Sequence, residues 1–222
     1  MQNEPVAART RWMPAIGNHE MEPWDGADGY GGMRARFTTP DNAWSQSTGI
    51  DFIVVYLHQC TYSTCHDNGA ELGAQQDWAP LFDKYKVDLV LSGHNHVYER
   101  TDPIRAGKAT RKVVSGDTVD PVKDGTTYVV AGGGGGGLYS FPASDTYLGH
   151  ESANDKPVPM VVSDRSGHSQ TVKVTWSRVR YAGYCLVAID VTPAVAGKPA
   201  RMELRSVTED GTAVDRVTVQ RG

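Results

Sequence analysis

The apolar positions between residues 52 and 91 form two short runs with a helical pattern between them. The runs cover residues 52–57 and 87–91, and their near-continuous apolar character is typical of strands buried on both faces. Between the runs, four apolar side chains recur at the i, i+3, i+4 and i+7 spacing of one helix face: Trp78, Leu81, Phe82 and Tyr85. This spacing predicts a helix over residues 73–86. Strand, helix and strand in this order predict a βαβ unit.

The chain after Arg100 has a different pattern, with short segments in which apolar and polar positions alternate. Five segments are separated by turns rich in Gly, Pro and Asp: residues 126–131, 171–176, 184–191, 201–207 and 214–219. Alternation with a period of two between turn residues predicts half-buried strands. We therefore expect a mixed or antiparallel sheet, with residues 171–222 as a β-rich C-terminal portion.

The first fifty residues show little periodicity. A strand end near Ile16 would place the next residues on a loop, but residues 21–49 follow neither a strand nor a helix period. A structureless stretch of that length is unusual inside a compact domain. Because it leads directly into the run at 52–57, we expect that a segment is missing at about Ile50–Asp51.

The composition of the 222-residue chain fits one soluble globular domain, with 39% hydrophobic and 22% charged residues. A net charge of −4 without a Lys/Arg cluster argues against nucleic acid as the main partner. The longest apolar run is too short to span a bilayer, so we expect no membrane partner. No basic-then-apolar leader opens the sequence, so no signal peptide is visible.

The three cysteines, Cys60, Cys65 and Cys185, are an odd number and so predict no disulfide framework. Cys60 and Cys65 either close a small loop in an oxidising compartment or remain thiols, and the sequence leaves both alternatives open. Cys185 lies in an apolar segment and is predicted to be a core residue. The six glycines at 132–137 lack the Lys-Ser/Thr of a phosphate-binding P-loop, which favours a tightly packed loop.

Histidines follow both apolar runs. His58 ends the first run, and His94 and His96 follow the second. Neutral imidazole binds zinc, iron and manganese, and two histidines at i and i+2 on extended chain point to the same side. Because the carboxyl ends of parallel strands meet at one edge of a sheet, we expect His58 and His94 at adjacent strand ends. His58 alone, at the end of an apolar strand, would more often be a core histidine than a ligand.

Three segments together resemble the last three of the five signature blocks of calcineurin-like metallophosphoesterases: Gly17-Asn18-His19-Glu20, residues 54–58 and residues 93–100. The Tyr98-Glu99-Arg100 tail is similar to the purple acid phosphatase branch in particular. The resemblance implies an α/β fold, a metallophosphoesterase β-sandwich flanked by helices with a β-rich C-terminal part. The family's two aspartate-bearing blocks do not appear in the sequence. We therefore expect one truncated domain over residues 1–222, an incomplete copy of the family.

The resemblance also implies a dinuclear metal centre with these ligands: Asn18, His58 and His94 for one ion and His96 for its neighbour. The ions implied are divalent or trivalent, iron with zinc, manganese or a second iron. His19 would contact the phosphate and assist the leaving group, and His66 lies near the family's substrate-side histidines. The register of His66 is off by about a residue, so a surface-loop histidine is its alternative. Glu20, Tyr98 and Arg100 are expected to brace loops.

The implied activity is metal-dependent hydrolysis of phosphomonoesters. Without the two aspartates, four neutral donors would hold two dications, and Asp67, Asp77 and Asp88 lack the Gly-Asp context. We therefore expect one weakly bound metal and weak or no activity. A non-catalytic metal-binding or interaction remnant is the main alternative, and a β-rich binding domain is a third. Family resemblance suggests a secreted or cell-envelope location, and missing strands would leave apolar surface for self-association.

Overall fold

The structure is a computed structural model that describes residues 51–66, 69–71, 73–142 and 157–221. These all belong to residues 50–222, one of the two compact units into which the chain divides. Several residues of the sequence analysis lie outside the described residues: Ile16, Gly17, Asn18, His19, Glu20, Ile50 and Asp67. The single domain over residues 1–222 and the missing segment at about Ile50–Asp51 stay predictions.

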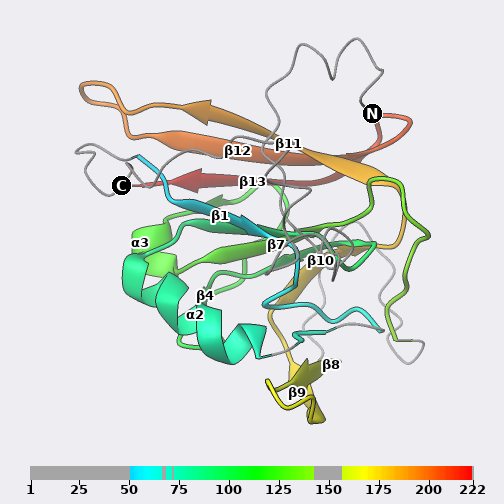
Figure 1. Ribbon diagram of the computed structural model, residues 1–222. Helices are drawn as coiled ribbons and strands as arrows, with labels where there is room; N and C mark the ends of the chain where they lie inside the picture. The colour runs from blue at the N-terminus through cyan, green and yellow to red at the C-terminus, as the bar shows by residue number, and fades with distance from the viewer. Residues whose placement is uncertain (1–50, 67–68, 72, 143–156, 222) are drawn as a thin grey trace, which may run out of the picture. The chain divides into compact units, whose positions relative to one another are not determined.

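The first sheet has five strands in the order β1-β2-β7-β3-β10 (Figure 1). Their bounds are β1 Val54–Leu57, β2 Leu89–Ser92, β3 Tyr98–Thr101, β7 Thr127–Ala131 and β10 Ser177–Tyr181. Strands β1, β2 and β7 are parallel, whereas β3 pairs antiparallel with both β7 and β10. The helix α2, Ala74–Tyr85, joins β1 to β2. The predicted βαβ unit is therefore confirmed.

The second sheet has four strands in the order β11-β12-β13-β6. Their bounds are β6 Thr118–Val119, β11 Cys185–Thr192, β12 Arg201–Thr208 and β13 Ala213–Gln220. Two hairpins lie outside both sheets: β4 Ile104–Arg105 with β5 Lys108–Ala109, and β8 Val158–Ser163 with β9 Ser169–Val174. The segment predicted at 171–176 thus begins in the β9 hairpin rather than in a main sheet.

Two apolar clusters cover opposite faces of the first sheet. Leu89 and Val129 pack between the sheets with Met202 of β12, and Val90 packs on the other face with Phe82 of α2. Adjacent residues of β2 point to opposite faces, so a strand buried on both sides needs an unbroken apolar run. This strand-rich α/β sandwich with few helices confirms the predicted fold class.

The helix α2 matches its predicted bounds but only part of its predicted buried face. Gly73 and Lys86 cap it in left-handed conformations, with φ of 75° and 53°. Ala74 and Ala79 are buried, whereas Leu81 and Tyr85 are 47% and 57% exposed. Of the predicted face, Phe82 packs on the sheet beside these small residues, whereas Leu81 and Tyr85 turn outward. None of the helices in the described residues is long and apolar enough to cross a membrane.

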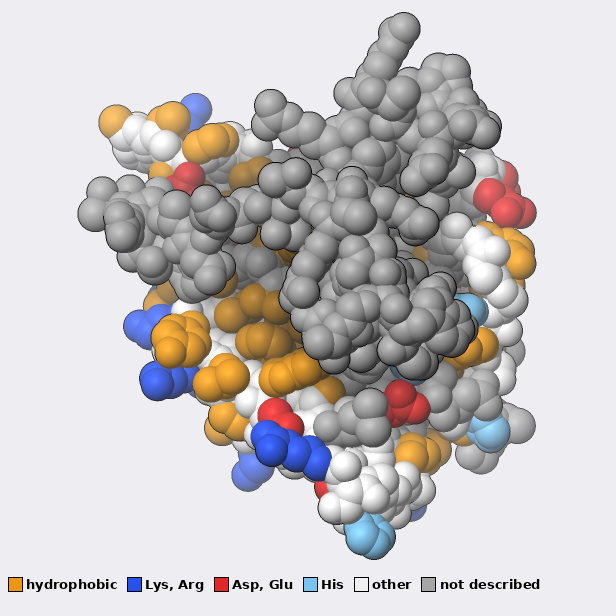
Figure 2. All heavy atoms as spheres, viewed as in Figure 1, with side chains coloured by type: hydrophobic (Ala, Val, Ile, Leu, Met, Phe, Trp, Pro, Cys, Tyr) orange, Lys and Arg blue, Asp and Glu red, His pale blue; other side chains and the backbone are white. Residues whose placement is uncertain are grey.

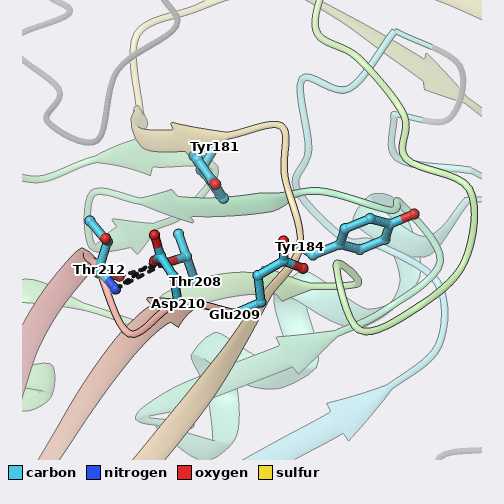
Figure 3. A pocket seen from close by; sticks show the side chains of 6 residues that line it. All are labelled: Tyr181, Tyr184, Thr208, Glu209, Asp210 and Thr212. Atoms are coloured by element: carbon cyan, nitrogen blue, oxygen red, sulfur yellow. Dashed lines mark hydrogen bonds between the residues drawn. The ribbon is translucent and has the colours of Figure 1, made fainter.

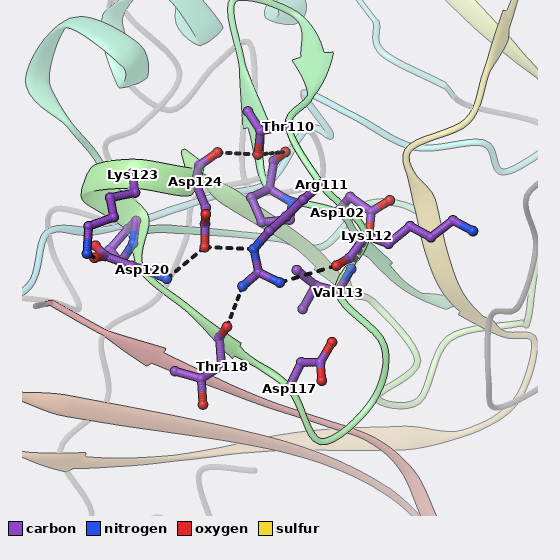
Figure 4. Close-up of polar contacts among 12 residues, drawn as sticks. Asp102, Thr110, Arg111, Lys112, Val113, Asp117, Thr118, Asp120, Lys123 and Asp124 are labelled. Carbon is purple, nitrogen blue, oxygen red and sulfur yellow. Dashed lines mark hydrogen bonds and ion pairs between the residues drawn. The ribbon is translucent and has the colours of Figure 1, made fainter.

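Short polar contacts anchor the connection between β5 and the four-residue helix α3, Pro121–Asp124 (Figure 4). Arg111 forms an ion pair with Asp124 at 3.0 Å and donates to the carbonyl oxygen of Thr118. Asp120 accepts from the backbone N–H of Val122 at 3.1 Å and caps α3. These contacts hold the irregular chain that leads from the hairpin to β6 and β7.

Buried charges connect the two sheets. Asp215 of β13 accepts from Tyr98 Oη at 2.7 Å and from Arg100 Nε and Nη2 at 2.5 and 3.1 Å. Burial alone would raise the pKa of Asp215, but Arg100 and Tyr98 hold it below its ordinary value. A buried charge is tolerated when it is paired and hydrogen-bonded. The expected bracing role of Tyr98 and Arg100 is confirmed.

Strand β1 is an edge of the first sheet among the described strands. Val55 and Leu57 pack toward α2, whereas Val54 and Tyr56 on the opposite face are 39% and 43% exposed. Figure 2 shows further hydrophobic side chains at the surface in the region of α2. The strand carries no charge and no proline, the features that commonly block edge pairing. An apolar edge of this kind is what missing strands would leave.

We propose that the edge of β1 supports self-association of the chain. Sedimentation velocity of the 222-residue chain is expected to show larger species as its concentration rises. Tyr56→Lys should suppress them, because it places a charge beside the edge. Val122→Lys, at a position 45% exposed on α3, is the matched control and should associate like the wild type. A wild type that stays monomeric throughout would contradict the proposal.

Candidate metal centre

His58 and His94 meet at the carboxyl ends of the parallel strands β1 and β2. His58 directly follows β1, and His94 follows β2 after Gly93, whose N–H donates to the carbonyl of His58 at 3.2 Å. The Nε2 atom of His58 lies 2.9 Å from Nδ1 of His94, and the ring centroids are 4.8 Å apart in an edge-on arrangement. The adjacency expected from the sequence is therefore confirmed.

The backbone at His94 adopts a left-handed conformation with φ of 57°. Such conformations cost roughly 1–3 kcal/mol for residues other than glycine and concentrate at functional sites. The N–H of Asn95 donates to the carbonyl of Gly93 at 2.6 Å, and its side chain donates to Ser63 Oγ at 2.8 Å. This tight turn aims the ring of His94 at His58.

The glycine run supports the turn by close packing. A Cβ atom on Gly132 would lie 2.0 Å from the carbonyl oxygen of Asn95, so only glycine allows this approach. The N–H of Gly132 donates to the carbonyl of Val97 at 3.1 Å. Close packing therefore holds for Gly132, Gly133 and Gly136, whereas a Cβ on Gly134, Gly135 or Gly137 would meet nothing within 4 Å, so the expectation of a closely packed loop is met only in part.

Glu71 is a site residue that the sequence analysis missed. Its Oε2 atom lies 3.0 Å from Nε2 of His94, opposite the nitrogen that faces His58. It lies three residues before the first residue of α2, Ala74, and belongs to no ligand motif, so only the folded chain brings it to the histidines.

The two histidines of Gly-His-x-His have different surroundings. His96 Nδ1 lies 2.5 Å from the carbonyl oxygen of Gly137, and its ring stacks on Tyr139 with centroids 4.4 Å apart. On the extended backbone expected from the sequence, His94 and His96 would point to the same side. Because His94 has a left-handed conformation, that prediction is wrong. His96 as a ligand of the second ion stays a prediction.

His66 is exposed, and its N–H donates to the carbonyl of Ser140 at 2.9 Å. The N–H of Tyr139 donates to the carbonyl of His96 at 3.2 Å. Residues 139–140 therefore join the loops that carry the two histidines. A substrate-side role for His66 stays a prediction.

The two facing nitrogens of the histidine pair lie at hydrogen-bond distance, slightly closer than two ligands of one cation. Metal–nitrogen bonds of about 2.0–2.1 Å in a tetrahedral site place two nitrogens roughly 3.3 Å apart, close to the observed 2.9 Å. The donors that the structure describes at the pair therefore fit half of a site. Within the described ranges no group of three or more His, Cys, Asp and Glu side chains is arranged to hold a metal.

Two aspartates considered from the sequence have other partners. Asp77 lies 2.6 Å from Arg165 Nε, and the hydrogen bond to Arg165 lowers its pKa. Asp88 is buried and pairs with Arg221 at 2.9 Å, although burial still raises its pKa above the ordinary value. Neither has replaced the carboxylates of the absent motifs.

Cys60, Cys65 and Cys185 are buried and carry no disulfide in the structure, which agrees with the thiol alternative for Cys60 and Cys65. Cys60 Sγ donates to the carbonyl of Gly93 at 3.4 Å, beneath the turn that carries His94. Burial raises its pKa to about 12, so it stays a neutral thiol at physiological pH. Cys185 is a core residue, as expected.

A surface pocket away from the histidine pair lies beside the turn between β12 and β13 (Figure 3), and the acidic residue in it has a structural role. It is lined by Tyr181, Tyr184, Thr208, Glu209, Asp210 and Thr212. Hydrogen bonds from Thr208 and Thr212 lower the pKa of Asp210 to about 2, because its carboxylate caps the turn between β12 and β13.

Comparisons with known proteins relate the chain to a family of phosphoesterases. The family model "Calcineurin-like phosphoesterase" matches residues 2–98. An uncharacterized protein of Mycobacterium tuberculosis is 30% identical over 269 residues, covering 88% of this chain and 49% of its own length. "Probable inactive purple acid phosphatase 1" of Arabidopsis thaliana is 42% identical over 72 residues, covering 32% of this chain and 11% of its own length.

A solved structure has a similar fold. The purple acid phosphatase PPD1 from yellow lupin seeds matches with a TM-score of 0.64 and 22% identity, over 94% of this chain and 40% of its own. These findings confirm the resemblance to calcineurin-like metallophosphoesterases. Within that class the similarity is to purple acid phosphatases.

The chain spans about half the length of the mycobacterial relative. The alignment of 269 residues is longer than this chain of 222, so the relative carries additional residues inside the aligned region. Additional internal residues agree with the expectation that a segment is missing, although the alignment does not locate them.

Close packing at Gly132 gives a direct test of how the turn is held. We expect Gly132→Ala to lower the free energy of unfolding by about 1–3 kcal/mol, because its Cβ collides with the Asn95 carbonyl. Gly134→Ala is the matched control, since a Cβ there meets nothing within 4 Å. Urea unfolding measures both, and equal stability of the two variants would contradict the packing argument.

Proposed function

We propose that this chain is part of a metal-dependent phosphoric monoester hydrolase with a dinuclear centre. The observation that carries the proposal is the approach of His58 and His94 to 2.9 Å at the ends of adjacent parallel strands. Similarity to metallophosphoesterases supports it. The substrate class is a phosphomonoester, and the proposed ions are iron with zinc, manganese or a second iron.

Asn18, His58 and His94 would hold one ion, and His96 the other. When bound, two such cations neutralise phosphoryl oxygens and supply a nucleophile from water near neutral pH. Because the amide and imidazole donors are neutral, the site keeps the positive charge that attracts phosphate. His19, beside Asn18, donates a proton to the leaving oxygen, a contribution of typically ~10²–10⁴-fold.

The charge of the donors limits the expected activity. Neutral ligands leave much of the charge of two dications uncompensated, and Asp77 and Asp88 are paired with arginines. Glu71 is the carboxylate that lies beside the pair. We therefore propose that the 222-residue chain alone is a weak hydrolase.

The alternative is a non-catalytic metal-binding or interaction remnant of a phosphatase. The lack of a cluster of three or more potential ligands among the described side chains favours it. The name of the Arabidopsis thaliana relative, a probable inactive purple acid phosphatase, shows that inactivity has been inferred for a similar protein. In this alternative the histidine pair binds an ion without turnover.

Hydrolysis of p-nitrophenyl phosphate by the purified chain tests the proposal. We expect slow turnover that a chelator removes and that His94→Ala abolishes. His168→Ala is the matched control, because this exposed histidine lies beside Asp164, and its turnover should equal that of the wild type.

Three other results of this assay would contradict parts of the proposal. Metal binding without any turnover would favour the non-catalytic alternative. Turnover that survives His94→Ala would exclude the histidine pair as the site. Fast turnover by the wild type would show that the charge argument is wrong and that another carboxylate compensates the ions.

A further inference from the structure

Both ring nitrogens of His94 have a neighbour at hydrogen-bond distance. Nδ1 faces Nε2 of His58 at 2.9 Å, and Nε2 faces Oε2 of Glu71 at 3.0 Å. A neutral imidazole carries one N–H and one lone pair. A carboxylate only accepts hydrogen bonds, so it selects the tautomer of His94 in which Nε2 carries the hydrogen.

We propose that Glu71 is a positioning residue for the metal centre. By accepting from Nε2–H of His94, it fixes the ring and turns the lone pair of Nδ1 toward His58 and the cation. The inference rests on the proposed metal-binding function. Carboxylate partners of metal-binding histidines set the tautomer and orientation of the ring and make it a better donor.

The backbone just before Glu71 is hydrogen-bonded to strand β8, which suits a positioning role. The N–H of Ala70 donates to the carbonyl of Val161 at 3.0 Å, and the N–H of Ser163 donates to the carbonyl of Ala70 at 2.9 Å. A Cβ on Gly69 would lie 1.8 Å from the Val161 carbonyl oxygen. Strand β8 therefore packs against Gly69 and hydrogen-bonds Ala70, the residues before Glu71. The β8–β9 hairpin, which lies outside both sheets, thus helps to place Glu71.

The geometry favours a role for Glu71 in orienting the ring of His94 over a role as a simple ion-pair partner. The side chains of His94 and Glu71 are 15% and 31% exposed, and solvent screens ion pairs at such positions. A hydrogen bond of fixed direction still selects one tautomer under these conditions. The competing role for Glu71 is direct binding of the metal by its carboxylate. That role requires the negative charge of Glu71, whereas orienting His94 requires only a hydrogen-bond acceptor.

Two measurements on Glu71→Ala and Glu71→Gln separate the roles. Long-range ¹H–¹⁵N spectra of the metal-free protein report the tautomer of His94. We expect the Nε2–H tautomer in the wild type and in Glu71→Gln, whose amide oxygen still accepts, and a mixture in Glu71→Ala. Calorimetry with Zn²⁺ should show affinity lower by roughly 10–100-fold in Glu71→Ala and close to wild type in Glu71→Gln.

Asp77→Asn is the matched control, because Asp77 pairs with Arg165 instead of a histidine. It should leave the tautomer and the Zn²⁺ affinity unchanged. An unaltered tautomer in Glu71→Ala would overturn the proposal. A Zn²⁺ affinity as low in Glu71→Gln as in Glu71→Ala would overturn it in favour of direct ligation. If no variant, the wild type included, bound Zn²⁺, the metal-binding function would fail, while the tautomer spectra would still decide the part of Glu71.

Discussion

The parallel pairing of β1 with β2 is the constraint on which the candidate site depends. Its register joins Val54 to Leu89 and Leu57 to Ser92, so both strands end at the same level and each delivers a histidine there. A slip of one residue would turn every side chain to the other face of the sheet. Burial on both faces of β2 makes such a slip costly, because Leu89 and Val90 pack in different apolar clusters.

Buried polar groups hold the loops around this edge in one arrangement. Glu99, 1% exposed, accepts from Ser63 Oγ and the Thr64 N–H at 2.8 Å each and from Ser177 Oγ at 2.5 Å. It ties the loop after His58 to β3 and β10. Because a buried carboxylate without such partners is strongly destabilising, few alternative loop positions are compatible with folding.

Much of the fold was predictable where the period of apolar residues in the sequence matches the face that the element buries. The helix expected at 73–86 is Ala74–Tyr85, and the strands at 201–207 and 214–219 are β12 and β13. Strand β10 was not among the predicted strands, and it carries the charged residues Arg178 and Arg180. Both are buried, and Arg178 pairs with Asp102 at 2.5 Å. The partner of a buried charge lies far along the chain, so sequence pattern alone does not reveal it.

At the candidate metal centre, too, some contacts follow from local sequence patterns and others from pairing between distant segments. The meeting of His58 with His94 follows from two strand ends, which local pattern marks. The approach of Glu71 depends on the pairing of Ala70 with β8, a contact across about ninety residues that no motif encodes. The left-handed backbone at His94 lies where Gly132 packs against Asn95, a contact distant in sequence, and it contradicts the expectation that His94 and His96 share a side.

The central claim is that His58 and His94 share one cation. Anomalous X-ray scattering from crystals soaked in Mn²⁺ or Zn²⁺ tests it most directly, because it locates the ion itself. The account predicts a peak within bonding distance, about 2.0–2.3 Å, of both His58 Nε2 and His94 Nδ1. A well-ordered histidine pair with no peak, or with ions bound only elsewhere, would contradict it.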